Sequence, residues 1–235
     1  MTFTEKSHAF IAAQYYRLMH DRFGDQGTSA FIHATMYYGE QRGRRMAQRC
    51  IKDGKELTAA NYYRYGEWNP TKEMIETQQS NQSTFLSYEP DRVSKITRCP
   101  WAKQFHEMGL NETGGEVYCK AIDAALVRGF NPELSFTTEQ TLQTNEFCIQ
   151  RMRNAGISPD EDLSKDPGNI KGFGYHCAHM FYAYRDICEA VFGEEGTAVS
   201  DEVFRLYEEN YGTKDAAYIR LYAGTDFSRC DSKEY

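Results

Sequence analysis

The apolar positions of the chain switch between a helical and a strand-like spacing. Near the start, Ile11, Tyr15 and Leu18 recur at i, i+4 and i+7, so they share one face of a helix over residues 5–22. Similar patterns predict helices over 29–52, 58–78 (interrupted near 69–70), 101–109, 115–128 and 173–192, and from 200 onward. Strand-like runs occupy 84–88, 92–98, 133–137 and 146–153.

Turn residues set the order of these elements. Glu89-Pro90-Asp91 lies between two strand-like runs and predicts a hairpin. Strands joined by tight turns pair antiparallel, so the order helices, hairpin, helix, hairpin, helix predicts an α+β fold with helices packed on a small antiparallel sheet. We expect a single domain over 1–235, with N-terminal helices 5–78, an α+β core 83–193, and a C-terminal helix and tail 200–235.

The sequence also predicts the structure of three segments outside these helices and strands. Gly24 and Gly27 are expected to end the first helix, and Thr28-Ser29 to cap the second. The polar segment 156–171 is expected to be a surface loop. The end of the chain from Thr225 onward is expected to fray.

Composition narrows the class of protein. The 235 residues carry 27 basic and 34 acidic side chains, a net charge of −7, which argues against a nucleic-acid partner. No apolar run has the length of a membrane span, and residues 1–13 lack the pattern of a signal peptide. We therefore expect a cytoplasmic protein with no membrane partner. In that compartment its seven cysteines are reduced thiols or metal ligands rather than disulfides.

The cysteines and histidines are the first candidates for chemistry. Cys99, Cys119 and Cys148 belong to elements that can converge in an α+β fold, and His176 follows on a later helix. Three thiolates and one imidazole are a common tetrahedral zinc set. No CxxC pair is present, so the alternative is that these cysteines are small buried hydrophobes.

Two further groups have alternative interpretations. Asp123 lies one helical turn after Cys119, where a carboxylate orients a ligand, acts as a base or pairs with a cation. Arg42, Arg44 and Arg45 form a basic cluster that either binds a substrate carboxylate or, as charge runs usually do, faces water at a helix end.

The middle of the sequence resembles the L-2-amino-thiazoline-4-carboxylic acid hydrolase family over roughly residues 30–192. The resemblance is carried by Cys99-Pro100-Trp101-Ala102-Lys103, Glu107-x-Gly109-Leu110, Tyr118-Cys119, Asp123, Gly129-Phe130-Asn131-Pro132, Cys148 and His176-Cys177-Ala178-His179. It implies a hydrolase that acts on a C–N bond of a small cyclic amidine and gives an N-carbamoyl amino acid.

The order of elements also looks like the 4-vinyl-reductase domain, in which a cysteine-rich site binds zinc beside a small-molecule pocket. Cys99, Cys119 and Cys148 loosely match its ligand positions. Nothing near Gly156 supplies the fourth ligand, so that role is assigned to His176.

These resemblances define the working hypothesis. A zinc ion held by Cys99, Cys119, Cys148 and His176 would activate water, with Asp123 or His179 moving protons. Trp101, Tyr118 and Asn131 would bind the small-molecule substrate, and the protein would work alone or as a homodimer. One alternative is a metal-free enzyme with a cysteine nucleophile activated by His176 or His179. Another is a zinc-stabilised ligand-binding or sensor domain without turnover.

Overall fold

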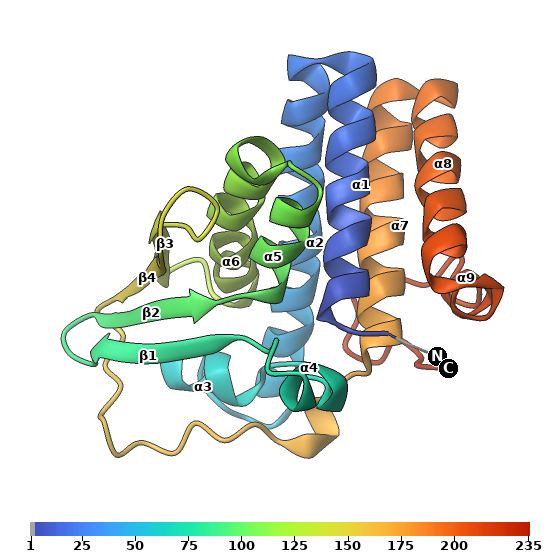
Figure 1. The fold of residues 1–235 in the computed structure, drawn as a ribbon. Coiled ribbons are helices and arrows are strands. Elements are labelled where there is room, and N and C mark those ends of the chain that lie inside the picture. Colours follow the sequence, from blue (N-terminus) through green and yellow to red (C-terminus); the bar gives the residue numbers. More distant parts are fainter. Residues whose placement is uncertain (1–2) are drawn as a thin grey trace.

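The structure is a computed structural model and describes residues 3–235. Two helical hairpins stand side by side (Figure 1). One consists of α1 (Glu5–Phe23) and α2 (Asp25–Lys52), and the other of α7 (Phe173–Phe192) and α8 (Glu194–Tyr211). Helix α9 (Thr213–Arg220) follows α8 at its far end. The α7 boundaries are those that the sequence predicts.

The two hairpins turn in the same way. Gly24 and Gly193 each take a positive φ, of 57° and 58°, which lets one residue reverse the chain. Three residues later, Gly27 and Gly196 lie against the backbone carbonyls of Met19 and Cys188, where no Cβ would fit. The prediction that α2 begins after Thr28-Ser29 is therefore wrong, since Gly27 lies inside the helix and provides its close approach to α1.

The predicted start of the last long helix at residue 200 is also wrong. Helix α8 begins at Glu194, directly after the Gly193 turn. Ser200 is buried within the helix and its hydroxyl donates to the carbonyl of Gly196 at 3.1 Å, so it does not cap a helix start. The end of the chain does not fray. Phe227 is 4% exposed, and the side chain of Gln48 donates to the Ser228 carbonyl at 2.8 Å.

A four-stranded antiparallel sheet lies beside the bundle (Figure 1). Its strands are β1 (Gln82–Ser87), β2 (Arg92–Arg98), β3 (Ser135–Gln140) and β4 (Cys148–Arg153), in the order β1-β2-β4-β3. Each hairpin pairs internally, and β2 joins β4 to connect the two. The predicted fold class, α+β with helices on a small antiparallel sheet, is confirmed.

Helix α6 (Glu116–Phe130) connects the sheet to the bundle. It packs on α2 and on β3. Gly43 of α2 faces the backbone of Leu126 and Phe130, and Gly129 of α6 faces the backbone of Glu40, with no space for a Cβ at either glycine. This close backbone contact fixes α6, and the side chains it carries, relative to α2.

Short elements connect these layers. They are α3 (Ala59–Arg64), α4 (Lys72–Glu76), α5 (Pro100–Glu107), a π-helical turn (Asn111–Gly115) and a 3-10 turn (Pro167–Asn169). Thr58 and Thr71 cap α3 and α4, accepting hydrogen bonds from the backbone N–H groups of Asn61 and Met74. The predicted helical stretch 58–78 is thus two helices, separated by an irregular segment around Glu67. Within residues 3–235, no helix has the length and apolar character needed to cross a membrane.

Candidate functional site

The three predicted thiol ligands do come from converging elements. Cys99 precedes α5 at the end of β2, Cys119 lies on α6, and Cys148 begins β4. Burial raises the pKa of Cys99 to about 11 and that of Cys148 to about 12. Burial also raises the pKa of Cys119 well above its usual value, and the neighbouring Cys99, Asp123 and Cys148 add to that shift. These groups are therefore neutral thiols at physiological pH.

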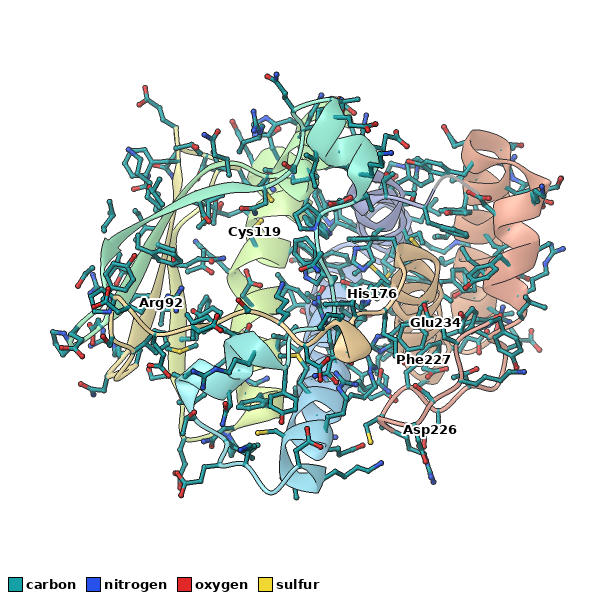
Figure 2. The ribbon with its side chains drawn as sticks, turned by 90° about the horizontal axis from the view of Figure 1, so that it is seen from below. Arg92, Cys119, His176, Asp226, Phe227 and Glu234 are labelled. Carbon is teal, nitrogen blue, oxygen red and sulfur yellow. The ribbon has the colours of Figure 1, made fainter. Side chains whose placement is uncertain are left out.

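His176 does not join the cysteines. It lies on α7, whereas Cys119 lies on α6 (Figure 2). Its Nε2 is 3.2 Å from the Glu67 carbonyl, and its ring packs against Phe173 and Tyr175. Among the residues that the structure describes, no group of three or more His, Cys, Asp or Glu side chains is arranged to hold a metal ion. The structure therefore does not support the predicted zinc set.

Asp123 is the acidic group beside the thiols. It lies on α6, and Gln150 of β4 donates to its Oδ2 at 2.7 Å. Burial raises the pKa of Asp123, while the positive charge of Arg42 on α2 and the hydrogen bond from Gln150 oppose that rise. A carboxyl group with a raised pKa, a single amide donor and a nearby cation is suited to accept and release protons.

A buried cluster of charge, which we call the arginine centre, lies within electrostatic reach of this carboxyl. It consists of Arg42, Arg45 and Arg49 of α2 together with Glu67. Arg45 donates to Glu67 through Nε at 3.1 Å and Nη2 at 2.7 Å, and Arg49 donates through Nη2 at 2.6 Å. The Nε of Arg42 is 3.7 Å from the same carboxylate. The three cations lower the pKa of Glu67 despite its burial, so it stays ionised.

The structure separates the members of the basic cluster by their burial. Arg44 faces water and pairs with Glu40 at 3.1 Å, as expected for an exposed helix end. Arg45, however, is fully buried, and the side chains of Arg42 and Arg49 are 12% and 13% exposed. The sequence contains a signal that these three arginines lie together, because residues 42, 45 and 49 follow the i, i+3, i+7 spacing of one helical face. Glu67 lies in an irregular segment and has no such signal.

Three histidines surround the arginine centre. Burial lowers the pKa of His8 and His179 well below the usual value, and that of His176 to about 3; nearby guanidinium charges lower all three further. Trp101 donates through Nε1 to Nδ1 of His8 at 2.9 Å, and His8 Nε2 is 2.9 Å from the Tyr38 hydroxyl. The predicted substrate contact Trp101 thus orients a neutral histidine.

His179, predicted to move protons, has partners on both ring nitrogens. Its Nδ1 is 3.4 Å and 3.3 Å from Nη1 and Nη2 of Arg45, and its Nε2 is 2.9 Å from Oε1 of Gln41. Because a guanidinium only donates, Nδ1 accepts and Nε2–H donates. The Phe227 ring stacks on the His179 ring, with 4.6 Å between the ring centroids. The backbone carbonyl of Phe227 accepts a hydrogen bond from Nη1 of Arg45. Figure 2 shows this part of the chain end beside α7.

The two remaining predicted contacts lie apart from the arginine centre. Tyr118 is 3% exposed and packs between Phe31 and Phe105, in the aromatic core. Asn131 ends α6; its amide donates to the Leu57 carbonyl at 2.8 Å, and its Oδ1 accepts from the Glu133 N–H at 2.9 Å. The packing of Tyr118 and the hydrogen bonds of Asn131 give both residues a structural role.

Comparison with known proteins agrees with the resemblance seen in the sequence. The model of the L-2-amino-thiazoline-4-carboxylic acid hydrolase family matches residues 4–148. The matched region is more than half of the chain, and it contains the arginine centre and Asp123. The chain therefore belongs to this family, whose name denotes a hydrolase. No curated protein and no solved structure matches the chain.

Proposed function

We propose that this protein hydrolyses a small cyclic amidine of the 2-amino-thiazoline-4-carboxylate type to an N-carbamoyl amino acid. The observation that carries the proposal is the family match over residues 4–148. Asp123 supports the proposal, because the matched region holds a buried carboxyl with a raised pKa within electrostatic reach of the Arg42 cation.

The expected chemistry follows from the ring itself. Water adds to the amidine carbon, one of its protons passes to a base, and the ring nitrogen gains a proton. When the adduct collapses, the bond from that carbon to sulfur breaks, the electron pair leaves with sulfur, and sulfur gains a proton. The water oxygen becomes the carbamoyl oxygen. An N-carbamoyl product therefore keeps the ring C–N bond and requires cleavage of the C–S bond, not of the C–N bond that the sequence analysis expects.

Asp123 is the group we assign to proton transfer. As a carboxylate it takes a proton from the attacking water and passes it to the ring nitrogen. It then takes the hydroxyl proton of the adduct and gives it to the leaving sulfur. The raised pKa supports this role, since an acid–base group works best when its pKa approaches the working pH. The hydrogen bond from Gln150 holds one carboxyl oxygen in place.

His179 and the cysteines have other roles in this proposal. Both ring nitrogens of His179 are occupied, so we assign it to positioning Arg45. The raised pKa of Cys99, Cys119 and Cys148 disfavours a thiolate nucleophile, because only the thiolate attacks the amidine carbon readily.

Hydrolysis can be tested directly on the purified chain. Incubation with L-2-amino-thiazoline-4-carboxylate in oxygen-18 water, followed by mass spectrometry, should show one labelled oxygen in the carbamoyl group and a free thiol in the product. Substrate that binds but stays unchanged would instead support the ligand-binding domain without turnover. A labelled product with no free thiol would mean that the C–N bond breaks.

A further inference from the structure

Arg42 is the member of the arginine centre that donates no hydrogen bond to Glu67. Its side chain is 12% exposed, and its closest acidic atom is Oε2 of Glu67, 3.7 Å from Nε. That Nε is buried and has no hydrogen-bond partner, and within residues 3–235 no hydrogen bond from the Arg42 guanidinium is formed. Its neighbour Arg45, in contrast, donates to Glu67, and its Nη1 donates to the carbonyl of Phe227.

Glu67 alone does not balance the positive charge of the arginine centre. Three guanidinium groups share the single carboxylate of Glu67, which leaves a net charge of two positive units. The three histidines are neutral and add no charge. Asp123 also lies within electrostatic reach of Arg42, and burial weakens its ionisation. Excess charge of this kind is costly in a protein interior unless an anion compensates for it.

A second cation, Lys165, lies within electrostatic reach of Arg42. Lys165 lies on the segment that runs from β4 to α7 across the lower end of the molecule (Figure 1). Its Nζ donates to the Trp68 carbonyl at 2.6 Å and lies 5.3 Å from the Trp68 ring centre. Burial and the charge of Arg42 lower the pKa of Lys165 to about 8. Two cations from different segments thus lie close enough to repel each other.

We propose that Arg42 and Lys165 form the binding site for the carboxylate of the substrate. A carboxylate between them would accept hydrogen bonds from the unpaired guanidinium and from the ammonium group, and would offset the excess charge. Arg45, Arg49 and Glu67 act as supports, because they fix the α2 face from which Arg42 extends. The inference rests on the proposed function, which supplies the identity of the substrate. Arg42 also lies within electrostatic reach of Asp123, the proposed proton-transfer group.

If this site binds a carboxylate, the protein should bind a ring that carries a carboxylate more tightly than the same ring without one. The probes are thiazolidine-4-carboxylate, whose saturated ring has no C=N bond to hydrolyse, and thiazolidine itself, which lacks the carboxylate. Isothermal titration calorimetry on the whole chain should show the acid binding at least about tenfold more tightly than the ring alone. Arg42→Gln and Lys165→Gln should each weaken binding of the acid about tenfold or more.

Arg44→Gln is the matched control, because Arg44 is the exposed neighbour on the same helix. It should bind the acid as the wild type does. Equal affinity of the wild type for both probes, or unchanged binding in Arg42→Gln and Lys165→Gln, would overturn the inference. Lys165 lies outside the helices, so its variant tests the site even if Arg42→Gln does not fold. Carboxylate-selective binding without hydrolysis would refute the proposed reaction and leave this site standing.

Discussion

Arg45 and Glu67 form a two-point ion pair in which neither side chain reaches solvent. Arg45 Nε lies 3.1 Å from Oε1, and Nη2 lies 2.7 Å from Oε2. The pair joins the middle of α2 to the irregular segment between α3 and α4. Because Nη1 of Arg45 also donates to the Phe227 carbonyl, the same guanidinium ties the end of the chain to α2. Three distant parts of the sequence are thus held at one buried side chain.

Removing the charge of Glu67 should destabilise the fold strongly. Glu67→Gln leaves three guanidinium groups without a counter-ion, and breaking a buried pair in this way costs about 3–5 kcal/mol. Denaturant unfolding at neutral pH measures the loss. Glu161→Gln, which removes the partly exposed partner of Arg64, should cost at most about 1 kcal/mol. A similar small loss in both variants would contradict the role given to Glu67.

The stabilisation from Glu67 should also depend on pH. Its pKa is lowered in the folded chain relative to the ordinary value of 4.5. Its contribution is therefore fully present above that ordinary value, and declines as the pH falls from there toward the folded-state pKa. The difference in unfolding free energy between wild type and Glu67→Gln should narrow over this acidic range.

Buried neutral histidines should make the fold sensitive to mild acid. The folded-state pKa of His8 is well below the ordinary 6.5. In mild acid, His8 is therefore protonated in the unfolded chain but neutral in the folded chain. Stability from this group is present above pH 6.5 and is lost as the pH falls below it. The slope is at most about 1.4 kcal/mol per pH unit for one histidine.

The variant His8→Gln should reduce that slope between neutral and mildly acidic pH, as measured by urea unfolding at several pH values. His33 is exposed on α2, so His33→Gln is the matched control and should keep the wild-type slope. An unchanged slope in His8→Gln would show that His8 takes up its proton while the chain is folded.

The close contact between α2 and α6 should not tolerate a methyl group at Gly43. A Cβ there would meet the backbone of Leu126, Phe130 and Gly129, none of which can rotate away. Gly43→Ala should therefore cost about 1–3 kcal/mol or more in unfolding free energy, through overpacking. At Gly39 the nearest atoms lie 3.0 Å away, one of them the side-chain methyl of Ala125, so Gly39→Ala should cost less. The reverse order would contradict this packing.

Much of this fold follows from local sequence patterns. The hairpin at Glu89-Pro90-Asp91, the antiparallel pairing and the full extent of α7 are all predictable, because turn residues and helical periodicity act locally. The hairpin tips at Gly24 and Gly193 are not. A glycine that ends one helix and starts the next looks like a simple break until the partner helix is in place.

The candidate site was predictable only in part. Asp123 and the convergence of Cys99, Cys119 and Cys148 follow from the order of the elements. The structure does not support His176 as a fourth zinc ligand, because α7 directs that ring toward the Glu67 carbonyl within the bundle. Glu67 has no signal in the sequence, since its importance comes from three arginines 18 to 25 positions earlier in the chain. Long-range charge pairing leaves no local pattern.

The three thiols should react slowly with alkylating reagents at neutral pH. The pKa of Cys99 is about 11 and that of Cys148 about 12, so thiolate is scarce, and the rate should rise with pH beyond the range of an ordinary thiol. Iodoacetamide labelling followed by peptide mass spectrometry measures each site, with the partly exposed Cys230 as the internal reference. Rapid labelling of Cys99 or Cys148 at neutral pH, blocked by substrate, would revive the nucleophile hypothesis.

The central claim is that Asp123 carries out the proton transfers of amidine hydrolysis. The most direct test is the kcat of Asp123→Asn with L-2-amino-thiazoline-4-carboxylate, measured beside wild type and beside Asp21→Asn, a control in an exposed part of α1. Loss of a general acid–base group should lower kcat by about 100-fold or more, with Asp21→Asn unchanged. An Asp123→Asn enzyme that retains the wild-type kcat would show that another group moves the protons.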